Sequence, residues 1–395
     1  MKNPTEHYSD SLFSRFEVLP NVKFCIVIPV KDEEEYILKN LTAFTMQVDI
    51  SGEPFDFEQF EILILANNCS DRSVAIIKDF QKNHPHLNIY LEEITLSPPY
   101  ANIGYVRRKL MDCACDRLSK NGGGMMLTTD GDTTVANDWI SQTEWEMKNG
   151  AEVVGGRILL YEDELESLDK FTSSCHFKDE KYQLLVAELE GRIINSSHDP
   201  LPRHHQHFNG SFAITTECYK RSGGIPKVEY LEDCAFFDRL QIVDAKIRHS
   251  FKVKVHTSAR CIGRAAVGLS YQLNVWKNLG QNIEDYSVES FDCISARLEE
   301  KKMLMDCWES KNQTKNEFAH TVKNIIPEIT VDDKLYSSFI NSLYFGEWYE
   351  QIIKLKQQIS FREKYPDARI GKVIKDLENT IHENSDHNFS QTSIR

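Results

Sequence analysis

Short apolar segments alternate with longer amphipathic ones through the first third of the chain. Residues 24–29 (FCIVIP) and 61–66 (EILILA) are continuous apolar runs, which is typical of strands buried on both faces of a parallel sheet. After the first run, Ile37, Leu41 and Phe44 recur at helical spacing. The pattern therefore predicts a strand that is followed directly by a helix packed against it.

The same alternation continues beyond the second run. Val74, Ile77 and Phe80 mark another helix, and further elements are predicted at 88–94 (strand), 103–119 (helix), 125–129 (strand) and 151–160 (strand). A charged helical stretch then reaches about residue 192, and a short apolar segment, FNGSFAI, follows at 208–214. From about residue 285 the pattern is helical and amphipathic, with apolar positions at Leu335, Phe339, Leu343 and Ile352.

Strands that alternate with helices over residues 24–130 predict a doubly wound, mainly parallel sheet of the α/β class. Ligands of such sheets bind at the carboxyl ends of the strands. The segments 29–33, 67–71 and 130–132 each follow a predicted strand, so we expect them to share one rim.

Composition narrows the function classes. With 395 residues, 41% hydrophobic and 27% charged, the chain is an ordinary globular protein with room for two domains. Its net charge of −14 argues against a nucleic-acid surface. Ten scattered cysteines without a C-x-x-C pair fit free thiols in a reducing compartment. No run of about 18 apolar residues occurs, so we expect a soluble, cytoplasmic protein.

The segment LTTDGDTTVANDWI places Asp130 and Asp132 at a strand end. Two carboxylates so close together suit Mg²⁺ or Mn²⁺, whose shell a substrate diphosphate would complete. A plain surface turn remains the alternative, since Asp and Gly favour turns. Neither a G-x-x-x-x-G-K-[ST] loop nor a G-x-G-x-x-G loop is present. A bound nucleotide would therefore depend on side chains and a metal to hold its phosphates.

Several motifs occur together in the order seen in one enzyme family. They are CIVIPVKDEEEYILKNL, EILILANNCSDRS, NIGYVRRKLMD, LTTDGDTTVANDWI, GGIPKVEYLEDCAFFDRL and HTSARCIGRAAVG. Over residues 22–270 the chain resembles family-two glycosyltransferases with the GT-A fold, especially soluble bacterial members with TDxDT and SARxxGR motifs. The resemblance implies a mixed, mainly parallel sheet flanked by helices, and metal-dependent transfer from a nucleotide-diphosphate sugar.

The resemblance also implies a domain plan. Residues 1–270 would form the catalytic domain, with a nucleotide-binding half at 22–135 and an acceptor-side half at 136–270. Residues 271–395 would form a mainly helical extension that carries no family motif.

Site residues carry over position by position. Pro29, the Val30 backbone and Glu33 match the first nucleotide-contacting loop, Asn67 matches the position that reads the base, and Arg107 matches an arginine near the base and phosphates. Asp130 and Asp132 match the metal-binding pair, and Asp130 also lies beside the nucleotide sugar. Asp233 matches the catalytic base of inverting members, with Glu232 beside it.

Two departures from the family pattern leave the identity of the nucleotide base open. Lys31-Asp32 stand where Tyr-Asn is common, and Ala66-Asn67 stand where an acidic residue is common. An Asn amide both donates and accepts, so it can pair with uracil or guanine.

Further candidates rest on weaker patterns. Arg260 and Arg264 are spaced to clamp a diphosphate or an acidic acceptor, or simply lie in solvent. His256 is a candidate third metal ligand, with a half-buried structural role as the alternative. His204, His205 and His207 precede FNGS and are candidates for the acceptor side, unless they are incidental residues of a mobile loop.

The aromatic residues near the C-terminus predict packing against the catalytic domain or a homodimer face; they are Tyr344, Phe345, Trp348 and Tyr349. Peripheral membrane contact would need a more basic face than Lys334, Lys354 and Lys356 provide.

Four functions are compatible with these patterns. The first is an inverting, metal-dependent glycosyltransferase acting on a glycan, lipid-linked or small-molecule acceptor. The others are a retaining enzyme that makes a small soluble glycoside, a non-catalytic nucleotide-sugar-binding protein and, less favoured because its glycine-rich loop is missing, a nucleotidyltransferase.

Overall fold

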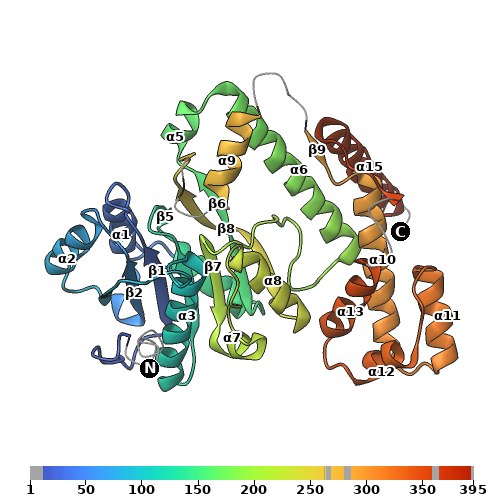
Figure 1. The fold of residues 1–395 in the computed structure, drawn as a ribbon, viewed down its shortest axis with the longest axis horizontal. Helices are drawn as coiled ribbons and strands as arrows, with labels where there is room; N and C mark the ends of the chain where they lie inside the picture. Colours follow the sequence, from blue (N-terminus) through green and yellow to red (C-terminus); the bar gives the residue numbers. More distant parts are fainter. Residues whose placement is uncertain (1–11, 262, 264–267, 280–285, 358–363, 393–395) are drawn as a thin grey trace. The chain divides into compact units, whose positions relative to one another are not determined.

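The computed structural model describes residues 12–261, 263, 268–279, 286–357 and 364–392 (Figure 1). The chain divides into two compact units. The sheet unit comprises Met1–Leu168, Gln206–Arg239 and Ala245–Val275, and the helical unit comprises Asp169–His205, Leu240–Asp244 and Trp276–Arg395. The domain plan placed one boundary at residue 270, whereas the helical unit also takes two segments from the middle of the chain.

The first half of the sheet unit follows the predicted alternation. Its parallel strands are β1 (Phe24–Val30), β2 (Phe60–Asn67), β3 (Ile89–Ile94) and β4 (Met125–Thr129), in the spatial order β3-β2-β1-β4. Between them run α1 (Ile37–Thr45), the short 3₁₀ helix η2 (Phe57–Gln59), α2 (Ser73–Asn83) and α3 (Ile103–Lys120). Every residue of β1 and β2 is buried, as their continuous apolar runs predicted.

The two faces of these strands pack on different helices. Ile26 and Ile28 of β1 join one cluster with Ile37 and Phe44 of α1. Neighbouring strand residues point to opposite faces, and α3 packs against β1 and β2. Helices therefore cover both faces, which explains why no polar residue interrupts β1.

The second half extends the sheet beyond β4. β7 (Ser211–Thr215) pairs antiparallel with β4 and with β6 (Val153–Leu160). β6 runs parallel to β8 (Ile247–Thr257), and β5 (Thr133–Val135) closes the edge antiparallel to β8. The eight-stranded order β3-β2-β1-β4-β7-β6-β8-β5 confirms the predicted mixed, mainly parallel α/β sheet. The remaining helices that begin in this unit are α4 (Trp139–Lys148), α5 (Glu162–Ser167), α7 (Thr216–Ser222), α8 (Glu232–Ile242) and α9 (Leu269–Asn278).

The helical unit has its own apolar core. It contains α6 (Lys170–Ile194), α10 (Phe291–Glu309), α11 (Lys315–Ile325), α12 (Asp333–Asn341), α13 (Phe345–Gln357), α15 (Ile370–Thr392) and the short pair β9 (Ser287–Val288) and β10 (Ala368–Arg369). Trp308 stacks on Trp348 with ring centroids 5.7 Å apart, and Phe318 lies 4.4 Å from Phe339.

Trp348 is fully buried in this cluster. The unit's own core therefore accounts for the burial of the C-terminal aromatic ring at Trp348, for which the sequence predicted a catalytic-domain or dimer face. Leu343 differs from the predicted helical pattern, because α12 ends at Asn341 and the extended backbone of Ser342 leaves Leu343 84% exposed.

No helix within the described ranges is long and apolar enough to cross a lipid bilayer.

A buried ion pair ties the amino-terminal segment to the sheet. Arg117 of α3 meets Glu61 of β2 through Nη2–Oε2 and Nε–Oε1 distances of 2.6 and 2.8 Å. The same guanidinium donates to the carbonyl oxygens of Phe13, Phe16 and Glu17. Glu61 is wholly buried, so the pair depends on both partners being present.

We expect Glu61→Ala to lower the free energy of unfolding by about 3 kcal/mol or more, because it leaves the Arg117 charge buried without a counter-ion. Urea denaturation followed by circular dichroism measures the change. The matched control is Glu58→Ala at an exposed site near the same strand, expected to change stability by about 0.5 kcal/mol or less. Equal effects of the two substitutions would contradict the assigned role of the pair.

Candidate active site

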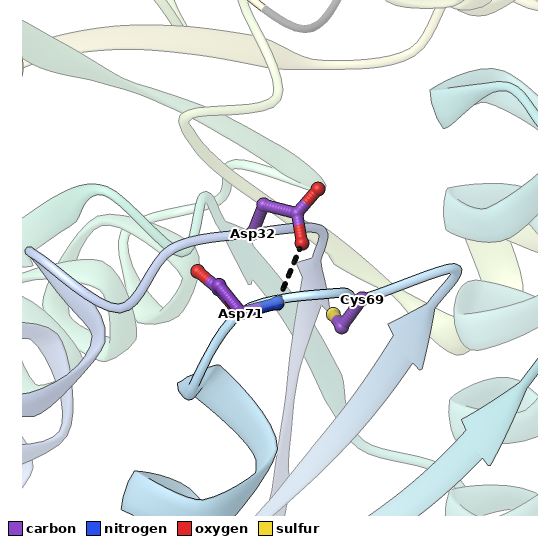
Figure 2. A group of neighbouring side chains, drawn as sticks. All are labelled: Asp32, Cys69 and Asp71. Carbon is purple, nitrogen blue, oxygen red and sulfur yellow. Dashed lines mark hydrogen bonds between the residues drawn. The ribbon is translucent and has the colours of Figure 1, made fainter.

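The loops after β1 and β2 are fastened together at the rim (Figure 2). One Asp32 carboxylate oxygen accepts hydrogen bonds from the backbone N–H groups of Ser70 and Asp71, at 2.6 and 3.3 Å. Asp71 in turn accepts from the N–H groups of Glu34 and Ser73, both at 2.9 Å. These carboxylates therefore hold the two loops together.

Asp32, Asp71 and Cys69 also bring ligand-type atoms within 4.8 Å of one another. The carboxylates already accept several backbone hydrogen bonds, and burial raises the pKa of the Cys69 thiol. A neutral thiol is a poor metal ligand, since the thiolate is the form that binds. We therefore assign this cluster to loop structure.

Three acidic side chains crowd the end of β4, and we call Glu33, Asp130 and Asp132 the carboxylate cluster. Glu33 is 6% exposed and Asp132 is 9% exposed. Arg260 reaches both of them, with its Nη1 2.8 Å from Glu33 Oε2 and its Nη2 2.7 Å from Asp132 Oδ2. The second Glu33 oxygen lies 3.1 Å from Nη2 of the same guanidinium.

The cluster has a shortage of positive charge. Burial raises the pKa of Glu33 to about 8, and repulsion from Asp132 adds to the shift although Arg260 opposes it. Burial also raises the pKa of Asp132; Arg260 opposes this shift and Asp130 adds to it. Carboxylates that are hard to ionise together in one place form a site that a further cation would stabilise.

The turn that carries the two aspartates is held from several sides. Asn40 of α1 donates its amide hydrogens to the carbonyl oxygens of Asp130 and Thr133, at 3.0 and 2.6 Å. The Tyr161 hydroxyl donates to the carbonyl oxygen of Asp132 at 3.3 Å. A Cβ at Gly131 would lie 3.0 Å from Glu33 Cγ, so glycine lets Glu33 approach the middle of the turn.

Arg107 connects this turn to the far side of the site. Its Nη2 lies 2.5 Å from Asp130 Oδ1, and its Nη1 donates to Thr128 Oγ1 at 2.7 Å. Its Nε faces Glu232 Oε1 at 3.4 Å, and Nη1 also reaches the carbonyl oxygen of Asn209 at 3.5 Å. The side chain is only 3% exposed, so its donors are directed at protein groups.

Glu232 and Asp233 form an acidic pair at the first turn of α8, where the helix dipole favours negative charge. Glu232 is 7% exposed; burial raises its pKa, and Arg107 opposes that shift. Asp233 is only partly buried, and its Oδ1 accepts the N–H of Cys234 at 2.8 Å. Leu231 before them has a positive φ of 53°, which turns the chain sharply into the helix.

The other predicted positions fall in different places. Pro29, Val30 and Asn67 lie at the carboxyl ends of β1 and β2, as expected. His256 is exposed, and it is Thr257, the next residue along β8, whose hydroxyl lies 3.4 Å from Asp132 Oδ1. Because strand neighbours point to opposite faces, the structure does not bring His256 to the aspartates.

Partial burial and Lys39 lower the pKa of His256, whereas Glu162 raises it. Arg264 lies outside the described residues. Among the candidates for the acceptor side, His204 is fully buried, and His207 stacks on Phe237 with ring centroids 3.5 Å apart. His205 belongs with His204 to the helical unit.

Sequence reasoning missed the supporting residues Asn40, Tyr161 and Thr257. A usable signal existed only for Asn40, which interrupts the apolar face formed by Ile37, Leu41 and Phe44. A polar residue on a buried helix face must have a hydrogen-bond partner, and here the partner is the aspartate turn.

The raised pKa of Glu33 predicts a pH dependence of stability. Its pKa in the folded state is about 8, above the ordinary value of 4.5. Between these two pH values, the folded state keeps a proton that the unfolded chain has lost. The contribution of Glu33 to the free energy of unfolding is fully present below the ordinary pKa, and it is lost as the pH rises toward 8. In EDTA, we expect wild type to lose about 2 kcal/mol more unfolding free energy than Glu33→Gln from pH 5 to 8. The exposed control Glu35→Gln should follow wild type, and parallel curves for wild type and Glu33→Gln would refute the shift.

A comparison with known protein families finds a match over the segment that contains the first two rim loops. Residues 25–101, from β1 to the loop before α3, match the sequence profile of glycosyl transferase family 2. No curated protein sequence matches the chain.

Several solved structures resemble it. TarS from S. aureus, in complex with UDP-GlcNAc, is 15% identical with a TM-score of 0.42, covering 85% of this chain and 78% of that chain. The mannosyltransferase PcManGT from Pyrobaculum calidifontis, in complex with GDP-Man and Mn²⁺, is 10% identical with a TM-score of 0.42, covering 87% and 82%. GalNAc-T7 with UDP, GalNAc and Mn²⁺ is 10% identical with a TM-score of 0.44, covering 87% and 58%. Residues 25–101 therefore resemble glycosyl transferase family 2, and this match supports a glycosyltransferase.

Proposed function

We propose that the protein transfers a sugar from a nucleotide-diphosphate sugar to an acceptor hydroxyl, with Mg²⁺ or Mn²⁺ and with inversion at the anomeric carbon. One observation carries the proposal: Arg107 contacts both Asp130 of the carboxylate cluster and Glu232 of the acidic pair. Arg107 thereby links the proposed diphosphate side of the site to the start of α8, which carries the proposed base Asp233.

The residues at the end of β4 fit a divalent ion. Asp130 and Asp132 supply the hard oxygen ligands that Mg²⁺ and Mn²⁺ prefer, and a guanidinium already lies against Asp132 and Glu33. When bound, such an ion neutralises the negative charge that develops on the leaving diphosphate. The protein's part is to hold the aspartates in place through Asn40, Tyr161 and Arg107.

The two acidic residues of α8 divide into different roles. Glu232 is buried against Arg107 and serves to position it. Asp233 is more accessible, and a carboxylate there accepts the proton of the acceptor hydroxyl as its oxygen attacks. The bond from the acceptor oxygen to the sugar C1 forms while the bond from C1 to the diphosphate oxygen breaks, so the anomeric configuration inverts.

The nucleotide would lie across the ends of β1 and β2. Pro29, the Val30 backbone, Glu33 and Asn67 border that position, and the Asn67 amide can serve either a uracil or a guanine edge. Of Arg107 and Arg260, it is Arg260 that can reach a diphosphate. Arg107, whose donors face Thr128, Asp130 and Glu232, is better assigned as a positioning residue than as a nucleotide ligand.

Release of nucleoside diphosphate from a panel of UDP-, GDP- and dTDP-sugars, with glycan, lipid-linked and small-molecule acceptors, tests the proposal. We expect Asp233→Asn to lower kcat by about 100-fold or more while the KM for the donor changes little, because the variant loses only the proton acceptor. The matched control Asp238→Asn, at an exposed position of the same helix, should keep the wild-type rate.

Two other results would redirect the assignment. Nearly full activity of Asp233→Asn would favour a retaining enzyme, which needs no base at this position. Binding of a nucleotide sugar without turnover on any acceptor would favour a non-catalytic binding protein.

A further inference from the structure

The guanidinium of Arg260 lies against the carboxylate cluster as a bound cation would. Its two Nη atoms make three contacts of 2.7–3.1 Å with oxygens of Glu33 and Asp132. The Arg260 side chain is 22% exposed, and those of Glu33 and Asp132 are 8% and 12% exposed. The chain thus already places one positive charge between two acidic side chains that belong to different rim loops.

We propose that Glu33 is the third carboxylate of the divalent-cation site and that Arg260 is its stand-in cation, which an entering Mn²⁺ or Mg²⁺ displaces. The inference rests on the proposed function, because it uses the same two aspartates. It adds Glu33 as a metal ligand and Arg260 as a group that competes with the metal. Glu33 thereby takes the role of third metal ligand, for which His256 was the candidate in the sequence.

The backbone around Glu33 is built to hold its carboxylate in place. The Glu33 N–H donates to the buried Ser73 hydroxyl at 2.7 Å. Its Cγ lies 3.0 Å from the position of a Cβ at Gly131, in the middle of the aspartate turn. Glu33 therefore presents hard oxygen ligands beside the aspartate turn.

The backbone next to Arg260 is anchored, and its guanidinium lies near an aromatic ring. The N–H of the preceding residue, Ala259, donates to Glu164 Oε2 at 2.6 Å, which fixes the chain beside it. The guanidinium already lies 5.9 Å from the ring centroid of Tyr36, at the edge of the cluster. Once released from Glu33 and Asp132, its planar fork suits the oxygens of a diphosphate.

Titration with Mn²⁺ in the absence of nucleotide, followed by calorimetry or electron paramagnetic resonance, tests the exchange. We expect Arg260→Gln to bind Mn²⁺ more tightly by on the order of tenfold, because the competing charge is gone. Arg260→Lys should stay near wild type, since it keeps that charge. Glu33→Gln should bind Mn²⁺ more weakly, by on the order of tenfold, because a ligand is lost.

Two controls separate competition from general charge effects. Lys254→Gln removes a positive charge from an exposed position of β8, the strand that precedes Arg260, and should change Mn²⁺ affinity by about twofold or less. His256→Ala should leave the affinity unchanged. Thermal unfolding of each variant shows whether it is folded before its affinity is compared.

Unchanged or weaker Mn²⁺ binding by Arg260→Gln would overturn the proposal, as would loss of binding in His256→Ala with full binding in Glu33→Gln. Because no nucleotide is present, this result is independent of sugar transfer. A protein that shows the expected Mn²⁺ series but binds no nucleotide would keep the cation site and lose the proposed function.

Discussion

The site depends first on one buried guanidinium. Arg107 projects from α3. It contacts Thr128 on β4, Asp130 just after β4, Asn209 before β7 and Glu232 on α8. These elements come from both halves of the sheet unit, and local sequence does not fix their spacing. A planar group with several donors can hold partners at set angles, which a lysine could not do. The arrangement of both acidic centres therefore follows from a single side chain.

The second constraint is crowding of negative charge at the end of β4. Three carboxylates share a space in which Glu33 and Asp132 are largely desolvated, so they depend on positive partners. Arg107 contacts Asp130 on one side, and Arg260 contacts Asp132 and Glu33 on the other. A structure that concentrates charge in this way is costly unless a cation is part of its working state. This crowding of negative charge is the physical observation behind the proposed metal-dependent transfer.

The sequence predicted what local patterns determine. Continuous apolar runs located β1, β2 and β4, and helical spacing located α1 to α3, so the shared rim and the aspartate turn followed. The pattern did not show β5, which is only three residues long and polar in part, or α4. The Glu33–Arg260 contact joins residues 227 positions apart, and spacing alone cannot report such a pair. For the same reason, α6 was not expected to share a unit with the C-terminal helices.

The central claim is that the aspartate turn binds a diphosphate through a divalent ion, and calorimetry tests it most directly. UDP, GDP, dTDP and CDP would be titrated into wild type and Asp132→Ala, each with Mn²⁺, with Mg²⁺ and with EDTA. The account predicts that at least one nucleotide binds wild type in the presence of metal, and that EDTA or the substitution abolishes this binding. Equal binding by wild type and Asp132→Ala, or no binding under any condition, would contradict it.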